Sequence, residues 1–148
     1  MSSPPIRIAQ ATENDLAEFA TWRDEPPYDF YDGDAEPVKN PERFFAARHD
    51  ESELVGFNYF EEKGDVREYE LGLCPELTGK GQGRKFVRAG LAFGRGRFAP
   101  RQIVLNVAAS NERAIRVYER VGFRETGRHI RRSERFGGVE FVEMEEQR

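Results

Sequence analysis

The chain has 148 residues, of which 38% are hydrophobic and 34% charged, and this balance fits one globular domain over 1–148 and excludes a disordered chain. Its formal net charge of −4 argues against nucleic acid as a partner, and without a run of about 18 apolar residues no membrane span is expected. The single cysteine, Cys74, excludes an internal disulfide and a thiolate zinc cluster, so a cytoplasmic protein is expected, although a secreted protein without disulfides would look the same.

The first half of the chain predicts a strand, a helix, a long loop and three short strands. Ile6 and Ile8 alternate with a polar residue, as in a strand, and a capping pattern predicts a helix over 13–23. Residues 24–41, rich in Pro, Asp and Tyr, predict a long loop of the kind that often carries function. An antiparallel meander is then expected from three short segments, over 43–48, 54–61 and 67–73.

A glycine-rich turn over 78–83 is the first candidate site. Its glycines allow a tight turn, and the free amides of the helix that it opens favour an anion. With the positive charges beside it, the turn would suit a pyrophosphate, although a plain strand-to-helix connection would look similar. The P-loop pattern is absent, and the dinucleotide-like glycines at 94–96 stand at the end of a helix, where they indicate a helix stop.

The second half of the chain alternates strands and helices. The apolar run over 103–107 predicts a strand buried on both faces, and the periodic segment 111–121 predicts a helix that Gly122 caps. Two final strands are expected over 123–131 and 139–146. The order of elements is therefore β-α-loop-β-β-β-α-β-α-β-β, which predicts an α/β fold with a mixed sheet.

Two segments of the chain resemble the signatures of the GNAT superfamily of N-acetyltransferases. The superfamily's cofactor loop reads Gln/Arg-x-x-Gly-x-Gly/Ala; Gly81 and Gly83 fill its glycines, whereas Thr78 stands where Gln or Arg is usual. Its second signature reads roughly Asn-x-x-Ala-x-x-x-Tyr-x-x-x-Gly-Phe, and every position is filled, by Asn111, Ala114, Tyr118, Gly122 and Phe123.

The resemblance implies a three-layer fold with a mixed, mostly antiparallel central sheet and helices on both faces. It also implies an enzyme that moves an acetyl group from acetyl-coenzyme A to an amine of a small molecule or protein, by direct transfer in a ternary complex. The pantetheine arm would lie where the third meander strand splays from the strand near Ile103. The residues implied to bind acetyl-coenzyme A are Leu71, Leu73, Gly79, Lys80, Gly81, Gln82, Gly83, Arg84, Asn111 and Ala114.

The resemblance assigns the general acid to Tyr118, which would protonate the departing thiolate, while a backbone amide near Leu73 would stabilise the oxyanion. Tyr118 also lies on the apolar stripe of its helix and would suit a purely structural place in the core. The general base stays open, because Asn106 stands where some relatives carry a glutamate. Glu68 and Glu70 are the candidates; a solvated strand face or a chain of water molecules are the alternatives.

The loop after the first helix is the expected acceptor site, because this segment usually lines the acceptor pocket in the superfamily. Its aromatic and acidic residues would suit a cationic amine, or they would simply pack the loop onto the domain. The residues concerned are Glu25, Tyr28, Phe30 and Tyr31. Many enzymes of this kind form homodimers, and no residue pattern here demonstrates or excludes one.

Two interpretations other than the enzyme stay open. A non-catalytic domain that binds coenzyme A, as a sensor or regulatory module, would explain the irregular Thr78 and the missing carboxylate at Asn106. A nucleotide-binding protein has only the glycine-rich turn in its favour. A cysteine nucleophile or a metal site is not expected, because His49 and His129 have neither a catalytic relation to Cys74 nor the spacing of ligands. The sequence does not identify the acceptor.

Overall fold

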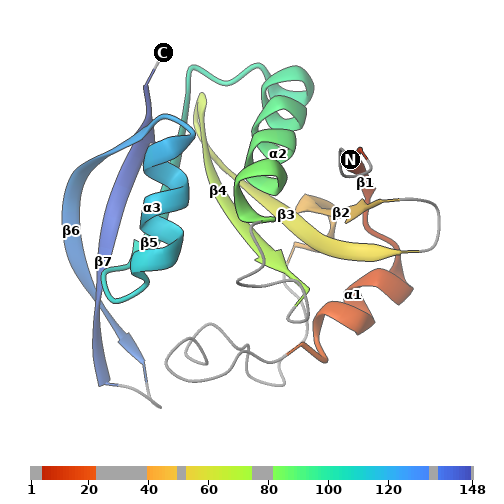
Figure 1. The fold of residues 1–148 in the computed structure, drawn as a ribbon, viewed down its shortest axis with the longest axis horizontal. Helices are drawn as coiled ribbons and strands as arrows, with labels where there is room; N and C mark the ends of the chain where they lie inside the picture. The colour runs from red at the N-terminus through yellow and green to blue at the C-terminus, as the bar shows by residue number, and fades with distance from the viewer. Residues whose placement is uncertain (1–4, 23–39, 50–52, 75–81, 134–136, 148) are drawn as a thin grey trace.

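The computed structural model describes residues 5–22, 40–49, 53–74, 82–133 and 137–147 (Figure 1). In these ranges the chain forms one seven-stranded sheet, three α-helices and a single 3-10 turn. In chain order they are β1 (Arg7–Gln10), α1 (Glu13–Phe19), the 3-10 turn η2 (Pro41–Arg43), β2 (Phe44–Arg48), β3 (Leu54–Lys63), β4 (Val66–Leu73), α2 (Gly83–Phe98), β5 (Gln102–Ala108), α3 (Glu112–Arg120), β6 (Phe123–Ser133) and β7 (Gly137–Glu146).

The strands lie side by side in the order β1-β2-β3-β4-β5-β7-β6. Every neighbouring pair is antiparallel except β4 and β5, which run parallel. The predicted mixed, mostly antiparallel sheet is therefore confirmed, and so is the predicted order of its strands and helices. The loop expected over 24–41 lies largely outside the described residues. The parallel pair joins the β1–β4 half of the sheet to the β5–β7–β6 half.

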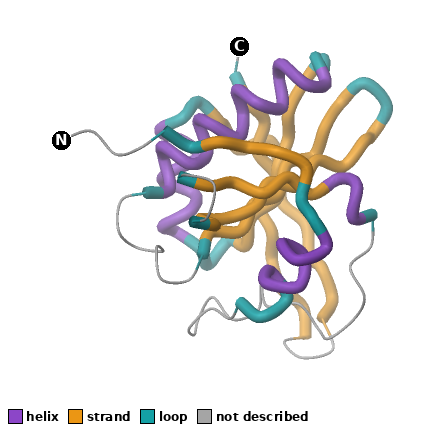
Figure 2. The backbone as a smooth tube through the Cα atoms, turned by 90° about the vertical axis from the view of Figure 1, so that its right-hand side faces the viewer, coloured by secondary structure: helices purple, strands orange, loops and turns teal. Residues whose placement is uncertain are grey.

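The helices cover both faces of the sheet (Figures 1 and 2). On one face α2 packs so closely that a Cβ atom at Gly90 would lie 2.4 Å from Asn58 Oδ1 of β3, and α3 lies beside α2. On the opposite face α1 places the ring of Phe19 4.9 Å from that of Phe57. Since side chains alternate along a strand, Asn58 and Phe57 mark the two faces of β3. The predicted three layers are confirmed.

The main hydrophobic core lies between the sheet and the pair α2 and α3. Burial of each large apolar side chain there contributes about 1.5–3 kcal/mol to folding. Its buried members are Phe45, Phe60, Tyr69, Val87, Leu91, Ile103, Leu105, Val107, Phe123, Val142 and Met144. In the described part of the chain, no helix has the length and apolar character needed to cross a membrane.

Helix α1 begins as predicted and ends earlier than predicted. Thr12 Oγ1 accepts a hydrogen bond from the Asp15 amide at 3.1 Å, and Asp15 Oδ2 accepts one from the Thr12 amide at 2.9 Å, which is a capping box. The helix ends at Phe19 because the next amides bond three residues back, from Thr21 to Glu18 and from Trp22 to Phe19. This tighter turn brings the Trp22 ring to 5.2 Å from the Phe19 ring.

The expectation that residues 103–107 form a strand buried on both faces was wrong. In β5, Ile103, Leu105 and Val107 are buried against the core, whereas Val104 and Asn106 are only half-buried. The physical reason is the placement of the helices, since α1 packs on β3 and does not extend over β5. One face of β5 is therefore left accessible next to β4.

Candidate functional site

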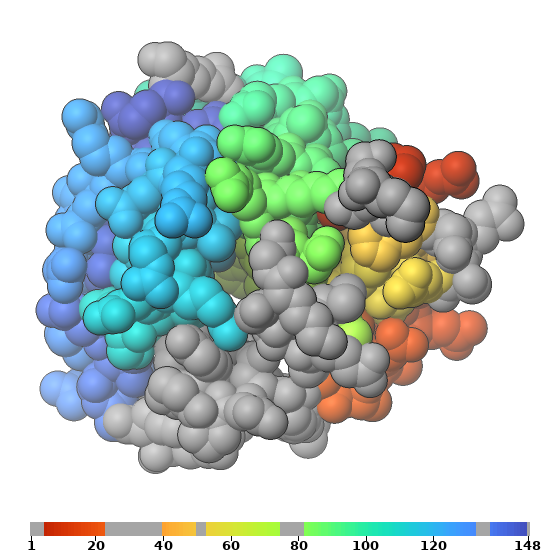
Figure 3. Space-filling view, viewed as in Figure 1, coloured from red at the N-terminus to blue at the C-terminus, as the bar shows by residue number. Residues whose placement is uncertain are grey.

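Strands β4 and β5 form a fork. Their parallel register covers three pairs of residues and ends with Glu68 opposite Val104. Beyond this point β4 continues to Leu73, paired only with β3, while β5 turns to β7 (Figure 1). The splay expected near Ile103 is therefore confirmed, and it leaves the backbone of residues 69–73 without a strand partner on the side of β5. The surface is hollowed where the fork opens between α2 and α3 (Figure 3).

The described residues predicted to bind the cofactor lie around this fork. Leu71 and Leu73 are half-buried on the unpaired part of β4, and Gln82 stands just before α2. A Cβ atom at Gly83 would lie 3.4 Å from Val117 Cγ2, so the start of α2 lies directly against α3. Arg84, in the first turn of α2, is exposed.

Asn111 and Ala114 form the beginning of α3. Asn111 is 7% exposed and caps the helix, because its Oδ1 accepts a hydrogen bond from the Ala114 amide at 3.2 Å. Ala114 packs against the core cluster. Both residues therefore have structural roles, which suffice to explain an asparagine and an alanine at these positions. Their contact with a cofactor stays a prediction.

Tyr118 lies on the helix-covered side of the fork. It is half-buried, and its ring lies 6.0 Å from that of Phe123. Burial raises the pKa of Tyr69, on β4, well above its ordinary value, and the nearby Tyr118 raises it further. The two phenols are therefore close enough to interact electrostatically, which places Tyr118 near β4.

Three glutamates of β3 and β4 lie on the opposite face of the sheet, and two of them are held by hydrogen bonds and ion pairs. Glu61 accepts hydrogen bonds from Arg43 Nη1 at 2.8 Å and from the Tyr59 hydroxyl at 3.0 Å. Glu68 is only 6% exposed and accepts a hydrogen bond from Asn106 Nδ2. It also pairs with two cations, since its Oε2 lies 3.2 Å from Lys63 Nζ and its Oε1 lies 3.7 Å from Arg131 Nη2.

Glu70 is different. Within the described ranges its carboxylate makes no hydrogen bond or ion pair. The residue is exposed to solvent, yet desolvation by the protein atoms around it raises the pKa of Glu70, and the negative charge of Glu68 raises it further. Glu70 follows Glu68 by two residues, so it lies on the same face, just inside the open part of the fork. It is therefore the better placed of the two candidates to take up a proton.

Aromatic rings extend this face toward the end of α1. Phe44, Phe57 and Tyr59 form a continuous cluster, with ring centroids 4.8 Å apart for Phe44 and Tyr59 and 5.4 Å apart for Phe44 and Phe57. Tyr59 stands opposite Glu70 in the β3–β4 register, and Phe57 stands opposite Gly72. The sequence indicated only strands here; alternation could have placed the rings on one face, but not next to Glu70.

Several predicted residues lie outside the described ranges, namely Gly79, Lys80, Gly81, Glu25, Tyr28, Phe30 and Tyr31. Sequence reasoning in turn missed Lys63 and Arg131, because no pattern in one sequence indicates that β3 and β6 both reach Glu68. Among the described residues, no three His, Cys, Asp or Glu side chains are grouped as a metal site. Cys74 is a half-buried free thiol.

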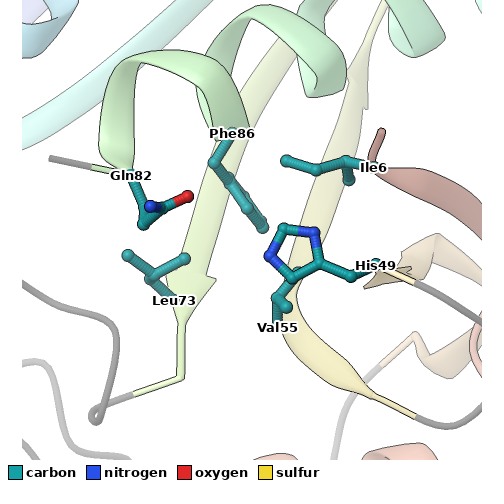
Figure 4. Close-up of a pocket in the computed structure, with 6 residues that line it drawn as sticks. All are labelled: Ile6, His49, Val55, Leu73, Gln82 and Phe86. Atoms are coloured by element: carbon teal, nitrogen blue, oxygen red, sulfur yellow. The ribbon is translucent and has the colours of Figure 1, made fainter. Parts of the chain in front are cut away.

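A shallow hollow of about 180 Å³, open solvent included, lies at the far end of β4 (Figure 4). It is lined mainly by apolar side chains, with His49 pointing into it, and the lining residues are Ile6, His49, Val55, Leu73, Gln82 and Phe86. It shares Leu73 and Gln82 with the fork, and none of its described lining residues has a carboxylate or phenol that could exchange a proton with a substrate.

Comparison with known proteins gives a family and a fold. The model of the acetyltransferase (GNAT) family matches residues 9–123. Over 100 residues the chain is 39% identical to mycothiol acetyltransferase of Streptomyces coelicolor, a match that covers 64% of this chain and 31% of the relative. The corresponding protein of Acidothermus cellulolyticus is 36% identical over 110 residues, which cover 62% of this chain and 32% of the relative. The chain thus spans about a third of the length of these curated relatives.

Solved structures of low sequence identity share the fold. The crystal structure of spermidine N-acetyltransferase from Vibrio cholerae in complex with CoA and spermine has a TM-score of 0.72 at 20% identity, with 95% of each chain covered. A chimera of that enzyme with hSSAT has a TM-score of 0.75 at 21% identity and covers 97% of this chain and 95% of that one. At this level of identity the likeness supports the architecture and not the acceptor.

Proposed function

Because this chain belongs to the acetyltransferase (GNAT) family, we propose that it transfers an acetyl group from acetyl-coenzyme A to an amine, directly and within a ternary complex. The observation that carries the proposal is the fork, in which β4 leaves β5 after Glu68. Its unpaired backbone suits the amide groups of a pantetheine arm, which would take the place of a neighbouring strand. The residues proposed to hold acetyl-coenzyme A there include Leu71, Leu73 and Gly83.

The two residues proposed to transfer protons, Glu70 and Tyr118, lie on opposite faces of the fork. Glu70 accepts the proton that the amine loses as its nitrogen attacks the thioester carbonyl carbon. Tyr118, on the opposite side, donates its hydroxyl proton to the thiolate as the carbon–sulfur bond breaks. A backbone amide near Leu73 stabilises the oxyanion between these steps. The products are the acetylated amine and free coenzyme A.

Glu70 is assigned as the base for a reason that sequence alone did not provide. A base must be able to bind a proton and must have a carboxylate that is free to reach the amine. The carboxylate of Glu68 is occupied by Lys63, Arg131 and Asn106, whereas Glu70 has no such partner among the described residues and its pKa is raised. Asn106, which cannot act as a base, instead orients Glu68.

We propose a small-molecule amine as the acceptor. The aromatic cluster Phe44, Phe57 and Tyr59 beside Glu70 would suit an ammonium group before it is deprotonated. The names of the similar proteins provide the first compounds to test, spermidine and the amine acceptor of mycothiol acetyltransferases.

The first experiment is calorimetric titration of the purified protein with acetyl-coenzyme A, with ATP and NAD as controls. Selective binding of acetyl-coenzyme A is expected, followed by release of free thiol in the presence of an acceptor amine. Equal binding of ATP would remove the assignment. Selective binding without thiol release across a broad panel of amines would favour the alternative, a coenzyme A-binding sensor.

A further inference from the structure

Glu68 stands at the point where the two halves of the sheet separate. It is the last residue of β4 paired with β5, opposite Val104, and Asn106 lies two residues further along β5. The hydrogen bond from Asn106 Nδ2 to Glu68 Oε1 therefore spans the strands just beyond the last backbone pair. A buried carboxylate joins the two halves here.

Two cations reach Glu68 from different parts of the sheet. Lys63, at the end of β3, lies 3.2 Å from Oε2, and Arg131 of β6 lies 3.7 Å from Oε1. Arg131 is held in place, because its guanidinium lies 4.7 Å from the centre of the Phe141 ring and its Nε donates a hydrogen bond to His129 Nε2 at 3.1 Å. The β6–β7 hairpin thus delivers a fixed positive charge to the opening of the fork.

Glu70 lies within the field of this arrangement. Among the described residues, the titratable groups that face it are Glu68 on its own strand, Glu61, Lys63 and Tyr59 on β3, and Arg131 from the hairpin. The two carboxylates raise the pKa of Glu70 and the two cations lower it, after desolvation has raised it first. Glu70 itself pairs with none of them in the described part of the chain.

We propose that Glu68 is the positioning residue of this site, a carboxylate clamped by one cation from β3 and one from β6 that sets the proton affinity of Glu70. The proposal deepens the assigned function and rests on Glu70 as the base. With the clamp in place, Glu70 has a near negative charge that favours proton uptake. The cations behind Glu68 limit this effect, because their positive charge lowers the pKa of Glu70. Arg131 makes the hairpin part of the catalytic electrostatics.

The test is a carbon-13 NMR titration of the glutamate carboxyl groups in the full chain, which needs neither acceptor nor turnover. The resonance of Glu70 is identified by its loss in Glu70→Gln. Removal of one of these charges is expected to move the carboxyl midpoint of Glu70 by about 1 pH unit, the lower end of the effect of a neighbouring charge, because the site is open to solvent. Glu68→Gln is expected to lower the midpoint of Glu70 and Arg131→Gln to raise it, both more strongly at low salt.

The matched control is Arg128→Gln. Arg128 is on the same strand as Arg131 and is about as exposed, 49% against 44%, but it pairs with Glu125 and Glu140 instead. This change should leave the Glu70 midpoint in place. Lys63→Gln, at an exposed side chain, should raise the midpoint and serves if Arg131→Gln does not fold. A midpoint that moves in the same direction in Glu68→Gln and in the cation variants, or in none of them, overturns the proposal.

The assignment of Glu70 as the base is tested separately, by the activity of Glu70→Gln. If Glu70→Gln keeps full acetyl transfer, Glu70 is not the base and the proposed mechanism fails, whatever the titration shows. If Glu70→Gln is inactive, the acid limb of the pH profile of kcat/KM should move in Glu68→Gln and Arg131→Gln in the same directions as the NMR midpoint. A structural role of Glu68 alone would lower turnover without moving that limb.

Discussion

At the scale of single residues, Tyr118 can be interpreted as a core residue or as the general acid. Only the second role requires its hydroxyl group. Its ring packs near Phe123, and phenylalanine would keep this packing while removing the hydroxyl. We expect Tyr118→Phe to lower kcat about 100-fold or more while the dissociation constant for acetyl-coenzyme A changes less than about twofold. Steady-state kinetics and calorimetry measure the two quantities. Unchanged turnover would leave Tyr118 as a core residue only.

Tyr69→Phe is the control for that substitution. Tyr69 is 1% exposed and its hydroxyl donates a hydrogen bond to Asn58 Oδ1. Its loss leaves a buried acceptor unsatisfied and should cost about 1–3 kcal/mol of unfolding free energy. Turnover of the folded protein should change little. These results would assign Tyr118 a role in catalysis and Tyr69 a role in stability, although both lie near β4.

The ionised carboxylate of Glu70, which the proposed reaction requires, is expected to lower the stability of the folded protein. Because its pKa is raised in the folded state, its folded form gains stability from protonation, and this contribution is lost as the pH rises through the folded pKa. Glu70→Gln should therefore raise Tm near pH 7.5, by no more than about 2 °C because the group reaches solvent, and should have no effect near pH 4. Thermal melts at both pH values check this; a lower Tm at pH 7.5 would contradict it.

The sequence could name residues of this site but not rank them. The family signature led to Tyr118, and the position of β4 led to both Glu68 and Glu70. Their difference depends on Lys63, Asn106 and Arg131, which come from three other strands. Contacts of this kind are set by the twist and order of the whole sheet, so no local pattern in the chain encodes them.

At the scale of elements, α2 depends on a glycine where it crosses β3 and β4. A Cβ atom at Gly90 would lie 2.4 Å from Asn58 Oδ1 and 2.5 Å from the Tyr69 hydroxyl, both buried. Gly90→Ala should therefore destabilise the protein by about 1–3 kcal/mol, despite the better helix propensity of alanine. Denaturant unfolding measures this change.

Gly96→Ala is the matched control in the same helix. Nothing lies within 4 Å of a Cβ atom at Gly96, and the residue is exposed. This substitution should stabilise the protein by about 0.5–1 kcal/mol, since only the backbone entropy of glycine is removed. If both variants changed stability in the same direction, close packing of α2 would not be what requires Gly90.

The elements were predictable where the pattern was local. The capping box at Thr12 and Asp15 and the alternation in the strands were all visible in the sequence. The end of α1 was not, because the helix ends in a tighter turn that packs the Trp22 ring against the rings of Phe19 and Phe57, which lies on another element. The burial of β5 was also misjudged, since its apolar run does not show which of its faces a helix covers.

At the scale of the whole molecule, the two halves of the sheet are joined through β4 and β5 by a register of only three pairs. A ligand that binds between β4 and β5 would contact both halves of the sheet. It should therefore raise the free energy of unfolding of the whole domain. At 100 times its dissociation constant, acetyl-coenzyme A should add about 2.7 kcal/mol, or about 5–10 °C in Tm. Hydrogen exchange should slow at residues 69–73, while ATP at the same concentration should leave both quantities unchanged.

The chain contains one tryptophan, and its position allows intrinsic fluorescence to report on ligand binding. Trp22 is half-buried at the end of α1, and its ring stacks 6.4 Å from that of Phe57, on the face that carries the aromatic cluster and Glu70. Its emission has no competing indole elsewhere in the sequence. An acceptor that settles against these rings would change the polarity around a single fluorophore, so amines could be ranked by quenching or spectral shift before any of them is acetylated.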